Sequence, residues 1–236
     1  MDNWQEDQIQ SLLGAKTDVA FFAELSRAAN KIGFDYCAYG MQMPLPVSKP
    51  KLIMLNNYSE GWQQRYLKEN YLAVDPTVAH GMRSVMPLVW SEKVFATSRP
   101  FWEDARAHGI CVGWAQSCYD SKGVGGLLTL ARSNDDLSGK ELSDISLKMS
   151  WLAQVAHEGL SRLVVSKMMP EVDVSLSARE IDVLRWTADG KTSSEVGEIL
   201  YISERTVNFH VNNALIKLGA ANKTAGVIKA AALGFL

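Results

Sequence analysis

Cysteine is scarce in this sequence. There are three cysteines, Cys37, Cys111 and Cys118, and no pair has CxxC spacing. An odd number without that spacing argues against both a disulfide framework and a zinc site. The cysteine content therefore suits a protein of a reducing compartment.

Histidine is sparse as well, and the spacings typical of catalytic metal sites are missing. The four histidines show neither HxH nor HExxH spacing: His80, His108, His157 and His210. There is also no GxSxG elbow, and Gly123-x-Gly125 is better interpreted as part of a hairpin than as a phosphate loop. Cys111 near His108 invites a nucleophile hypothesis, but both are more simply residues at a helix-to-strand junction. We expect no enzyme activity, no metal and no cofactor. An enzyme remains the alternative function, to be tested by incubating the protein with a candidate small molecule and looking for turnover by mass spectrometry.

Long apolar runs are absent too. No stretch approaches the roughly 18 consecutive apolar residues of a membrane span. The first ten residues, MDNWQEDQIQ, are acidic and polar, unlike a signal peptide. We therefore expect a cytoplasmic protein with no membrane partner.

Charge of either sign is not in excess. The formal net charge is −2, so the whole chain lacks the basic signature of nucleic-acid binding, and any such signal must come from local arrangement. The 236 residues, 47% of them apolar, are enough for two domains that each bury a core.

The chain divides after one long predicted helix. Residues 138–163 carry apolar side chains at helical spacing, and Ser138 with Glu141 can form a capping box at its start. Pro170 then interrupts the helical period. We predict a first domain over 1–165, a linker over 166–175 and a second domain over 176–236, with no internal repeat.

The first domain mixes helices and strands. Helices are expected over 18–31, 59–67 and 98–108, with another that begins at Asp75-Pro76. Strands are expected over 34–41, 111–119 and 125–132, the last two as a hairpin. An antiparallel sheet with helices packed on its faces is the simplest assembly of these elements.

The second domain reads as four short helices, each with its own N-cap. Ser177 with Glu180 and Thr192 with Glu195 form capping boxes, while Ser203 and Asn222 can cap the third and fourth helices. Such short helices are unstable alone and must bury their apolar faces together. The close succession of the second and third helices is the helix-turn-helix arrangement. The predicted fold class is therefore α+β for the first domain followed by an all-α helix-turn-helix domain.

The third helix of this module is the candidate recognition helix. If Val207, Val211 and Leu218 face inward, the opposite face is rich in side chains that can read base edges. Lys191 and Lys217, near helix ends, are placed to meet phosphates. The candidate DNA-binding residues are Lys191, Thr192, Arg205, Thr206, Asn208, Phe209, Asn212, Asn213 and Lys217. The alternative is an ordinary solvated polar face, which does not explain an outward phenylalanine.

Residues 174–236 contain seven basic and six acidic residues, an excess of one positive charge. Phosphate neutralisation supplies most of the affinity for DNA, so a single copy should bind weakly. Dimerisation would double the contacts.

These motifs resemble the LuxR family of quorum-sensing regulators. The run from Leu176-Ser-Ala-Arg-Glu180 through Ile202-Ser-Glu-Arg-Thr-Val-Asn-Phe-His210 to Lys217-Leu218 is similar to the family's C-terminal signature, which many regulators share. In the first half, Trp62-x-x-x-Tyr66, Tyr71-x-x-x-Asp75-Pro76, Pro87-Leu-Val-Trp90 and Gly109-x-x-x-Gly113 resemble the autoinducer-binding domain. The resemblance spans nearly the whole chain, and the acidic cluster expected of a receiver domain is not seen.

The resemblance implies a fold, a ligand and an assembly. It implies an α-β-α sandwich as sensor domain, an N-acyl homoserine lactone as ligand, and a homodimer that binds an inverted repeat in double-stranded DNA. Carried over by position, Trp62 would donate to the lactone carbonyl and Asp75 would accept from the amide N–H. Tyr58 and Thr129 would meet the acyl carbonyl. The remaining ligand-binding positions are Ala38, Tyr66, Trp90, Phe101 and Ile110.

Several positions depart from the pattern of the family and leave the acyl chain open. Ala38 lacks the hydroxyl that several relatives carry there, and Ser117 and Asp120 replace an expected proline and glycine. Gly125 and Gly126 suggest a widened cavity. Taken singly, Trp62 and Trp90 could be core aromatics and Asp75 only an N-cap. A regulator that is lactone-independent, or that reads another small molecule, is the alternative function.

Overall fold

The computed structural model describes residues 4–134, 136–168 and 174–236. The chain divides into two compact units. The larger, called here the sheet unit, comprises the chain up to Gln42, Leu52–Tyr119 and Gly125–Leu163. The smaller comprises Met43–Lys51, Asp120–Val124 and Val164–Leu236 and contains the helical module formed by the last four helices.

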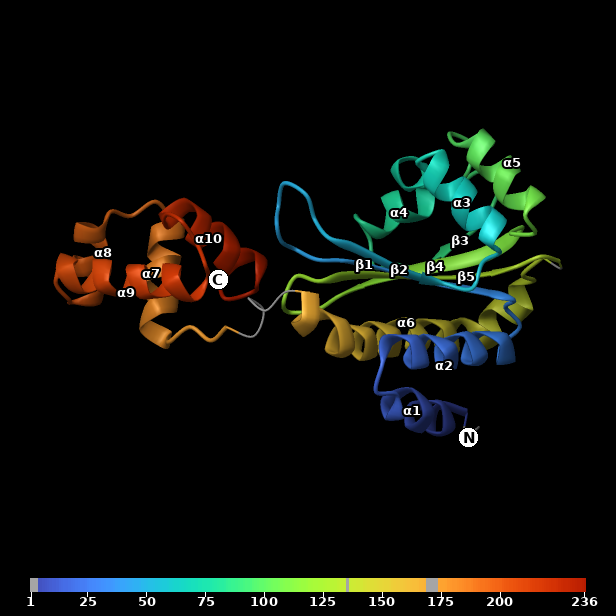
Figure 1. Ribbon diagram of the computed structural model, residues 1–236, viewed down its shortest axis with the longest axis horizontal. Helices are drawn as coiled ribbons and strands as arrows, with labels where there is room; N and C mark the ends of the chain where they lie inside the picture. Colours follow the sequence, from blue (N-terminus) through green and yellow to red (C-terminus); the bar gives the residue numbers. More distant parts are fainter. Residues whose placement is uncertain (1–3, 135, 169–173) are drawn as a thin grey trace. The chain divides into compact units, whose positions relative to one another are not determined.

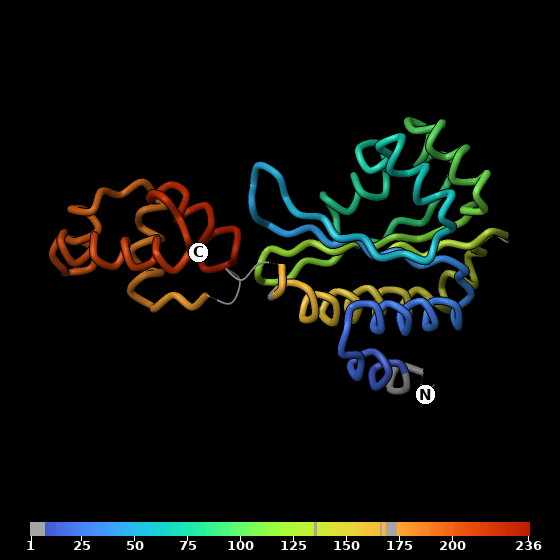
Figure 2. Tube along the Cα trace, viewed as in Figure 1, coloured from blue at the N-terminus to red at the C-terminus, as the bar shows by residue number. Residues whose placement is uncertain are grey.

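The sheet unit is built on five antiparallel strands in the order β2-β1-β5-β4-β3. Their bounds are β1 Tyr36–Gln42, β2 Leu52–Asn56, β3 Leu88–Val89, β4 Val112–Tyr119 and β5 Gly125–Arg132. The trace in Figure 2 shows β1 lying beside β5, although they are distant in sequence. The hairpin predicted for the last two strands is confirmed as β4 and β5, and β1 begins two residues later than expected.

Helices cover both faces of this sheet, which gives the α-β-α sandwich (Figure 1). On one face lie α3 Glu60–Lys68, α4 Pro76–Gly81 and α5 Arg99–Ala107, with the single 3₁₀ turn η1 Tyr71–Ala73 between α3 and α4. On the other face lie α2 Asp18–Lys31 and α6 Gly139–Met168. α2 has the predicted bounds. Thr17 caps it by accepting a hydrogen bond from Ala20 N. Four elements were missed by the sequence prediction: α1 Trp4–Gly14, β2, η1 and β3.

The long helix begins directly after its predicted cap, Ser138, but extends beyond its predicted end. Ser138 accepts a hydrogen bond from Glu141 N, but the Glu141 carboxylate binds Arg132 through both oxygens, at 2.7 and 2.9 Å. The hydrogen bond from Arg132 lowers the pKa of Glu141, and the Ser138 backbone N–H also binds this carboxylate and helps to lower that pKa. The predicted capping box therefore shares Glu141 with Arg132 on β5. The helix also runs to Met168, so the expected linker begins with helical residues, and Pro170 lies outside the described residues.

The helical module has the four predicted helices, each with the expected cap. These are α7 Ala178–Ala188, α8 Ser193–Leu200, α9 Glu204–Lys217 and α10 Lys223–Ala232. Both predicted capping boxes are complete, and Ser203 and Asn222 accept hydrogen bonds from the backbone of α9 and α10. Val183, Val196, Val207 and Val211 form the buried core. The fold class is thus the predicted one.

No helix in the described ranges is both long and apolar enough to cross a membrane.

Candidate functional site

The first candidate site is an aromatic cluster on one face of the sheet. Trp62 and Tyr66 come from α3, Phe101 from α5 and Trp90 from the residue after β3. The cluster comprises Trp62, Tyr71, Phe95, Phe101, Trp102, Ala105, Ile110 and Ala131, with Tyr36, Tyr58, Tyr66, Trp90 and Val94 packed against it. The structure therefore brings together most of the apolar side chains that the sequence proposed for a ligand chamber.

Trp62 lies at the centre of this cluster. It is 3% exposed, and its ring is 5.8 Å from the rings of Tyr66, Tyr71 and Phe101. Helical spacing puts Trp62 and Tyr66 on the same face of α3, four residues apart. In the described part of the chain the indole N–H of Trp62 has no hydrogen-bond partner. A bound molecule with a carbonyl oxygen could accept that bond.

Asp75 places a carboxylate beside the same cluster. It is the N-cap of α4, and its Oδ1 accepts from Thr77 N at 2.8 Å and from Thr77 Oγ1 at 2.7 Å. Its Oδ2 accepts from the Tyr66 hydroxyl at 3.0 Å. The side chain is thus both a cap, as the simpler interpretation held, and an acceptor tied to an aromatic residue of the cluster.

Burial raises the pKa of Asp75, although the hydrogen bonds from Thr77 and Tyr66 work against that rise. Burial also raises the pKa of Tyr58 and of Tyr66, and the negative charge on Asp75 raises each further. Both phenols therefore keep their protons and can donate hydrogen bonds. Asp75 keeps acceptor capacity because a carboxylate oxygen has more than one lone pair.

The strands under the cluster contribute small and polar side chains. Ala38, Thr129 and Ala115 are cross-strand partners in one row. Ala115 lies two residues from Gly113, where an added Cβ would come within 2.6 Å of the Trp90 ring. Because alternate residues share a face, this row faces the same side as Trp90. The Thr129 hydroxyl is thus directed to the side of the sheet that carries the cluster.

Two glycines do not widen the chamber as the sequence suggested. A Cβ on Gly125 would lie 2.8 Å from the Tyr119 ring, so that space is already filled. A Cβ on Gly126 would lie 2.0 Å from the Tyr39 hydroxyl, on the opposite face of the sheet. The expectation was wrong because a glycine in a strand can accommodate a bulky neighbour as well as leave a void. Gly40, by contrast, has nothing within 4 Å of an added Cβ.

Several residues of this site were missed from the sequence. Phe95 and Trp102 stack at 4.2 Å with an interplanar angle of 2°, and Trp90 packs against both edge-on. The Tyr71 hydroxyl donates to Asp104, which also binds Arg65 at 2.6 Å. The Tyr71-x-x-x-Asp75 spacing was the available signal for Tyr71. Asp104 gave no sequence signal, because its partners Arg65 and Tyr71 lie on other elements and not one turn away on α5.

Trp90 carries a second unused donor. Its indole nitrogen is buried and has no hydrogen-bond partner among the described residues. An unmade hydrogen bond of a buried group costs about 1–3 kcal/mol, so a molecule with an acceptor near this nitrogen would gain from binding.

The second candidate site is the outward face of α9. Val207, Val211 and Leu218 are fully buried, as predicted. Arg205, Asn212 and Phe209 are exposed, Phe209 at 59%. Thr206, Asn208 and Asn213 are partly buried on the flanks. The predicted orientation of the helix therefore agrees with the structure, and DNA contact by these residues remains a prediction.

Two of the candidate DNA-binding side chains are already engaged within the module. Lys217 Nζ lies 2.8 Å from Glu180 Oε2, and Glu180 is 4% exposed. Asn208 Oδ1 accepts hydrogen bonds from Ser193 and Lys223. Lys223 was not among the predicted residues, since its place at the start of α10 gives no sequence signal of its contact with α9. Lys191 and Thr192 are exposed before α8, where Thr192 caps that helix.

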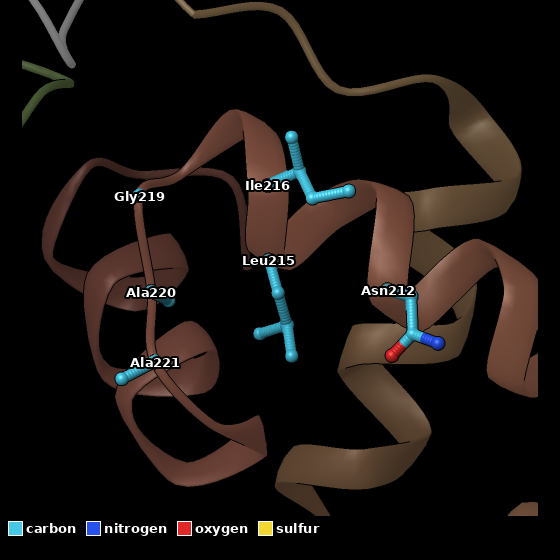
Figure 3. Close-up of a pocket in the computed structure, with 6 residues that line it drawn as sticks. All are labelled: Asn212, Leu215, Ile216, Gly219, Ala220 and Ala221. Carbon is cyan, nitrogen blue, oxygen red and sulfur yellow. The ribbon is translucent and has the colours of Figure 1, made fainter.

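An open hollow of about 550 Å³ lies where α9 ends (Figure 3). It is lined by Asn212, Leu215, Ile216, Gly219, Ala220 and Ala221. Ile216 is 78% exposed at its edge. The hollow is mostly apolar and belongs to the helical module, so it is separate from the aromatic cluster.

Metal chemistry has no support from the described side chains. Among them, no three histidine, cysteine or acidic groups come together as metal ligands would.

Two family models match the chain, one for each candidate site. An autoinducer binding domain matches residues 17–160, and the model described as bacterial regulatory proteins, luxR family, matches residues 174–230. The first contains the aromatic cluster, and the second contains α7, α8, α9 and most of α10.

Individual proteins match over their full length. The transcriptional activator protein AnoR of Acinetobacter nosocomialis is 47% identical over 100% of both chains. The crystal structure of SdiA from Escherichia coli has a TM-score of 0.83 at 33% identity and covers 99% of this chain and 98% of its own. A structure of SdiA in complex with octanoyl-rac-glycerol has a TM-score of 0.82 at 34% identity over 99% and 96%.

Proposed function

Because this chain belongs to the luxR family of bacterial regulatory proteins, we propose that its ligand is an N-acyl homoserine lactone. As a member of that family it is a quorum-sensing transcriptional regulator and not an enzyme. We propose further that it acts as a homodimer on an inverted-repeat promoter site, in the cytoplasm. The autoinducer-binding domain takes a small-molecule ligand, and the helix-turn-helix module binds DNA.

One observation carries the lactone assignment. A buried acceptor, Asp75, and an unused indole donor, Trp62, both adjoin one aromatic cluster, and Tyr66 contacts both residues. An acyl homoserine lactone offers the complementary groups, an amide N–H and a lactone carbonyl, beside an apolar tail. The aromatic cluster can bury the apolar tail and ring of the ligand, and each Å² of apolar area buried contributes about 25 cal/mol to binding.

The remaining polar groups suit the acyl carbonyl. Tyr58 retains its proton, and Thr129 faces the cluster side of the sheet, so either hydroxyl can donate to that oxygen. Ala38, the cross-strand partner of Thr129, adds only a methyl group to this row. Trp90, Phe101 and Ile110 supply apolar walls.

Mass spectrometry tests the ligand class directly. The protein is purified after expression with and without a mixture of N-acyl homoserine lactones, and bound lipid is extracted and identified. Recovery of an intact lactone at one per chain supports the proposal. Recovery of no lactone from a folded, DNA-binding protein contradicts it.

A second ligand class has a specific observation in its favour. The SdiA structure contains octanoyl-rac-glycerol, an acyl chain with a hydroxylated head in place of a lactone. Asp75 could accept from such a hydroxyl as readily as from an amide N–H. Competition between octanoylglycerol and N-octanoyl homoserine lactone, followed by calorimetry, separates the two classes.

The small positive excess over residues 174–236 supports the proposal of dimeric DNA binding. Two copies on an inverted repeat would double the phosphate contacts and place the recognition helices a whole number of helical turns apart. Sedimentation of the protein–DNA complex gives the stoichiometry, and one chain per operator would contradict this part of the proposal.

A further inference from the structure

Asn208 and Asn212 lie one turn apart on α9, but only one of them has a free amide. Asn212 is exposed, and within the described chain its side chain makes no hydrogen bond. Figure 3 shows its oxygen and nitrogen together at the tip of the side chain. Asn208 is partly buried and is bound to two neighbouring helices.

The contacts of Asn208 form a chain of donors. Lys223 Nζ donates to Ser193 Oγ at 2.7 Å, and Ser193 Oγ donates to Asn208 Oδ1 at 2.8 Å. Lys223 Nζ also donates to Asn208 Oδ1 at 3.3 Å. Ser193 begins α8 and Lys223 begins α10, so three helices of the module meet at this amide.

This arrangement determines the orientation of the amide. A lysine ammonium is only a donor, so it faces the amide oxygen and not the amide NH₂. Both lone pairs of Asn208 Oδ1 are then used within the protein. The NH₂ group remains, and the neighbouring cation polarises it toward stronger donation.

The two asparagines therefore differ in what they can read. An asparagine that recognises adenine must accept from N6 and donate to N7 at the same time. Asn208 cannot do so while its oxygen is occupied, because the amide then has no acceptor left for the N6 donor of adenine. Guanine presents only acceptors, O6 and N7, at that edge.

We propose that Asn208 recognises guanine by acting only as a hydrogen-bond donor, an inference that rests on the DNA-binding function. Lys223 and Ser193 are positioning residues that impose this reading. Asn212, whose amide is unrestricted, keeps the ability to pair with adenine.

The test uses the full-length protein to select bound DNA from a pool of duplexes with a randomised 20-base-pair centre. The selection is run with and without a mixture of acyl homoserine lactones, and the bound duplexes are sequenced. The wild type should enrich guanine at the position whose preference disappears in Asn208→Ala. Lys223→Met should admit adenine there, because it frees one lone pair of the oxygen. Lys191→Met is the matched control, since it removes an exposed ammonium without touching Asn208. It should weaken binding and leave the base preference unchanged.

A second measurement tests the bond itself. Replacing the selected guanine by 7-deazaguanine, which lacks the N7 acceptor, should weaken wild-type binding about 5- to 100-fold. The same replacement should leave Asn208→Ala unaffected. Circular dichroism confirms that each variant is folded.

Enrichment of adenine by the wild type at the Asn208 position would overturn the inference, as would an unchanged preference in Asn208→Ala. Failure of the wild type to enrich any sequence would instead contradict the DNA-binding function, and the inference with it.

Discussion

The Tyr66 hydroxyl donates a hydrogen bond to Asp75 Oδ2 across 3.0 Å and so joins α3 to the N-cap of α4. The same tyrosine packs edge-on against Trp62. A donor and an acceptor on different elements are thereby held next to one aromatic cluster, and the first two predictions follow from that arrangement.

Asp75→Asn should weaken lactone binding by about 1–3 kcal/mol, or roughly 5- to 150-fold, because the amide is a poorer acceptor and one of its ends is a donor. Calorimetry with N-octanoyl homoserine lactone measures the change. Asp144→Asn, an exposed substitution on α6 with the same change of charge, should leave affinity unaltered. Equal affinities for Asp75→Asn and wild type would remove Asp75 from the site.

Lactone binding should depend on pH in the acid range. Burial raises the pKa of Asp75, and the ligand N–H requires the ionised carboxylate. Affinity should therefore be constant above this raised pKa and fall as pH drops through it, in a window above the ordinary aspartate range. Titrations from neutral pH downward should show the fall in wild type and not in Asp75→Asn. A flat profile in wild type would mean that the carboxylate does not bind the ligand.

Gly126→Ala should destabilise the protein by about 1–3 kcal/mol, because its Cβ would overlap the Tyr39 hydroxyl and the His157 ring. Tyr39 and His157 are joined by a buried hydrogen bond of 2.7 Å, so neither can move without loss. Gly40→Ala is the matched control on the neighbouring strand, where a Cβ meets nothing and should be neutral or slightly stabilising. Thermal unfolding compares them, and equal midpoints would contradict the assignment.

Lys217→Met should destabilise the helical module by about 1–3 kcal/mol at neutral pH, because it leaves the Glu180 carboxylate without its cation. Burial raises the pKa of Glu180, but hydrogen bonds from Lys217 and Ser177 outweigh it and lower that pKa overall. The stabilisation is present above the unfolded pKa and is lost as pH falls through the lowered folded value. The difference between variant and wild type should therefore shrink in acid.

Hydrogen exchange of the α7 amides measures this stability within the full chain. Lys191→Met serves as the control, because it should weaken binding to operator and scrambled DNA alike without changing α7 exchange. Faster α7 exchange in Lys191→Met than in Lys217→Met would contradict the assignment of Lys217 to the ion pair.

Local chemistry let the sequence predict most of the helices. Ser177, Thr192, Ser203 and Asn222 each cap a helix of the second domain, because the cap and the amide it satisfies lie within three residues. The apolar period placed Val207 and Val211 inward for the same reason. β2 and β3 were missed because they are the edge strands: β2 has no buried face to give an alternating apolar pattern, and β3 is only two residues long.

The sequence also determined which residues could supply donors, acceptors and apolar surface. Only the tertiary structure decided which of those groups are already used. Trp62 and Asn212 make no side-chain hydrogen bond within the described chain, while Asn208 and Lys217 are committed to partners on other helices. Gly126 accommodates Tyr39 and not a ligand for the same reason. A side chain carries its chemistry in its covalent structure, but its availability depends on neighbours that the fold brings from elsewhere in the chain.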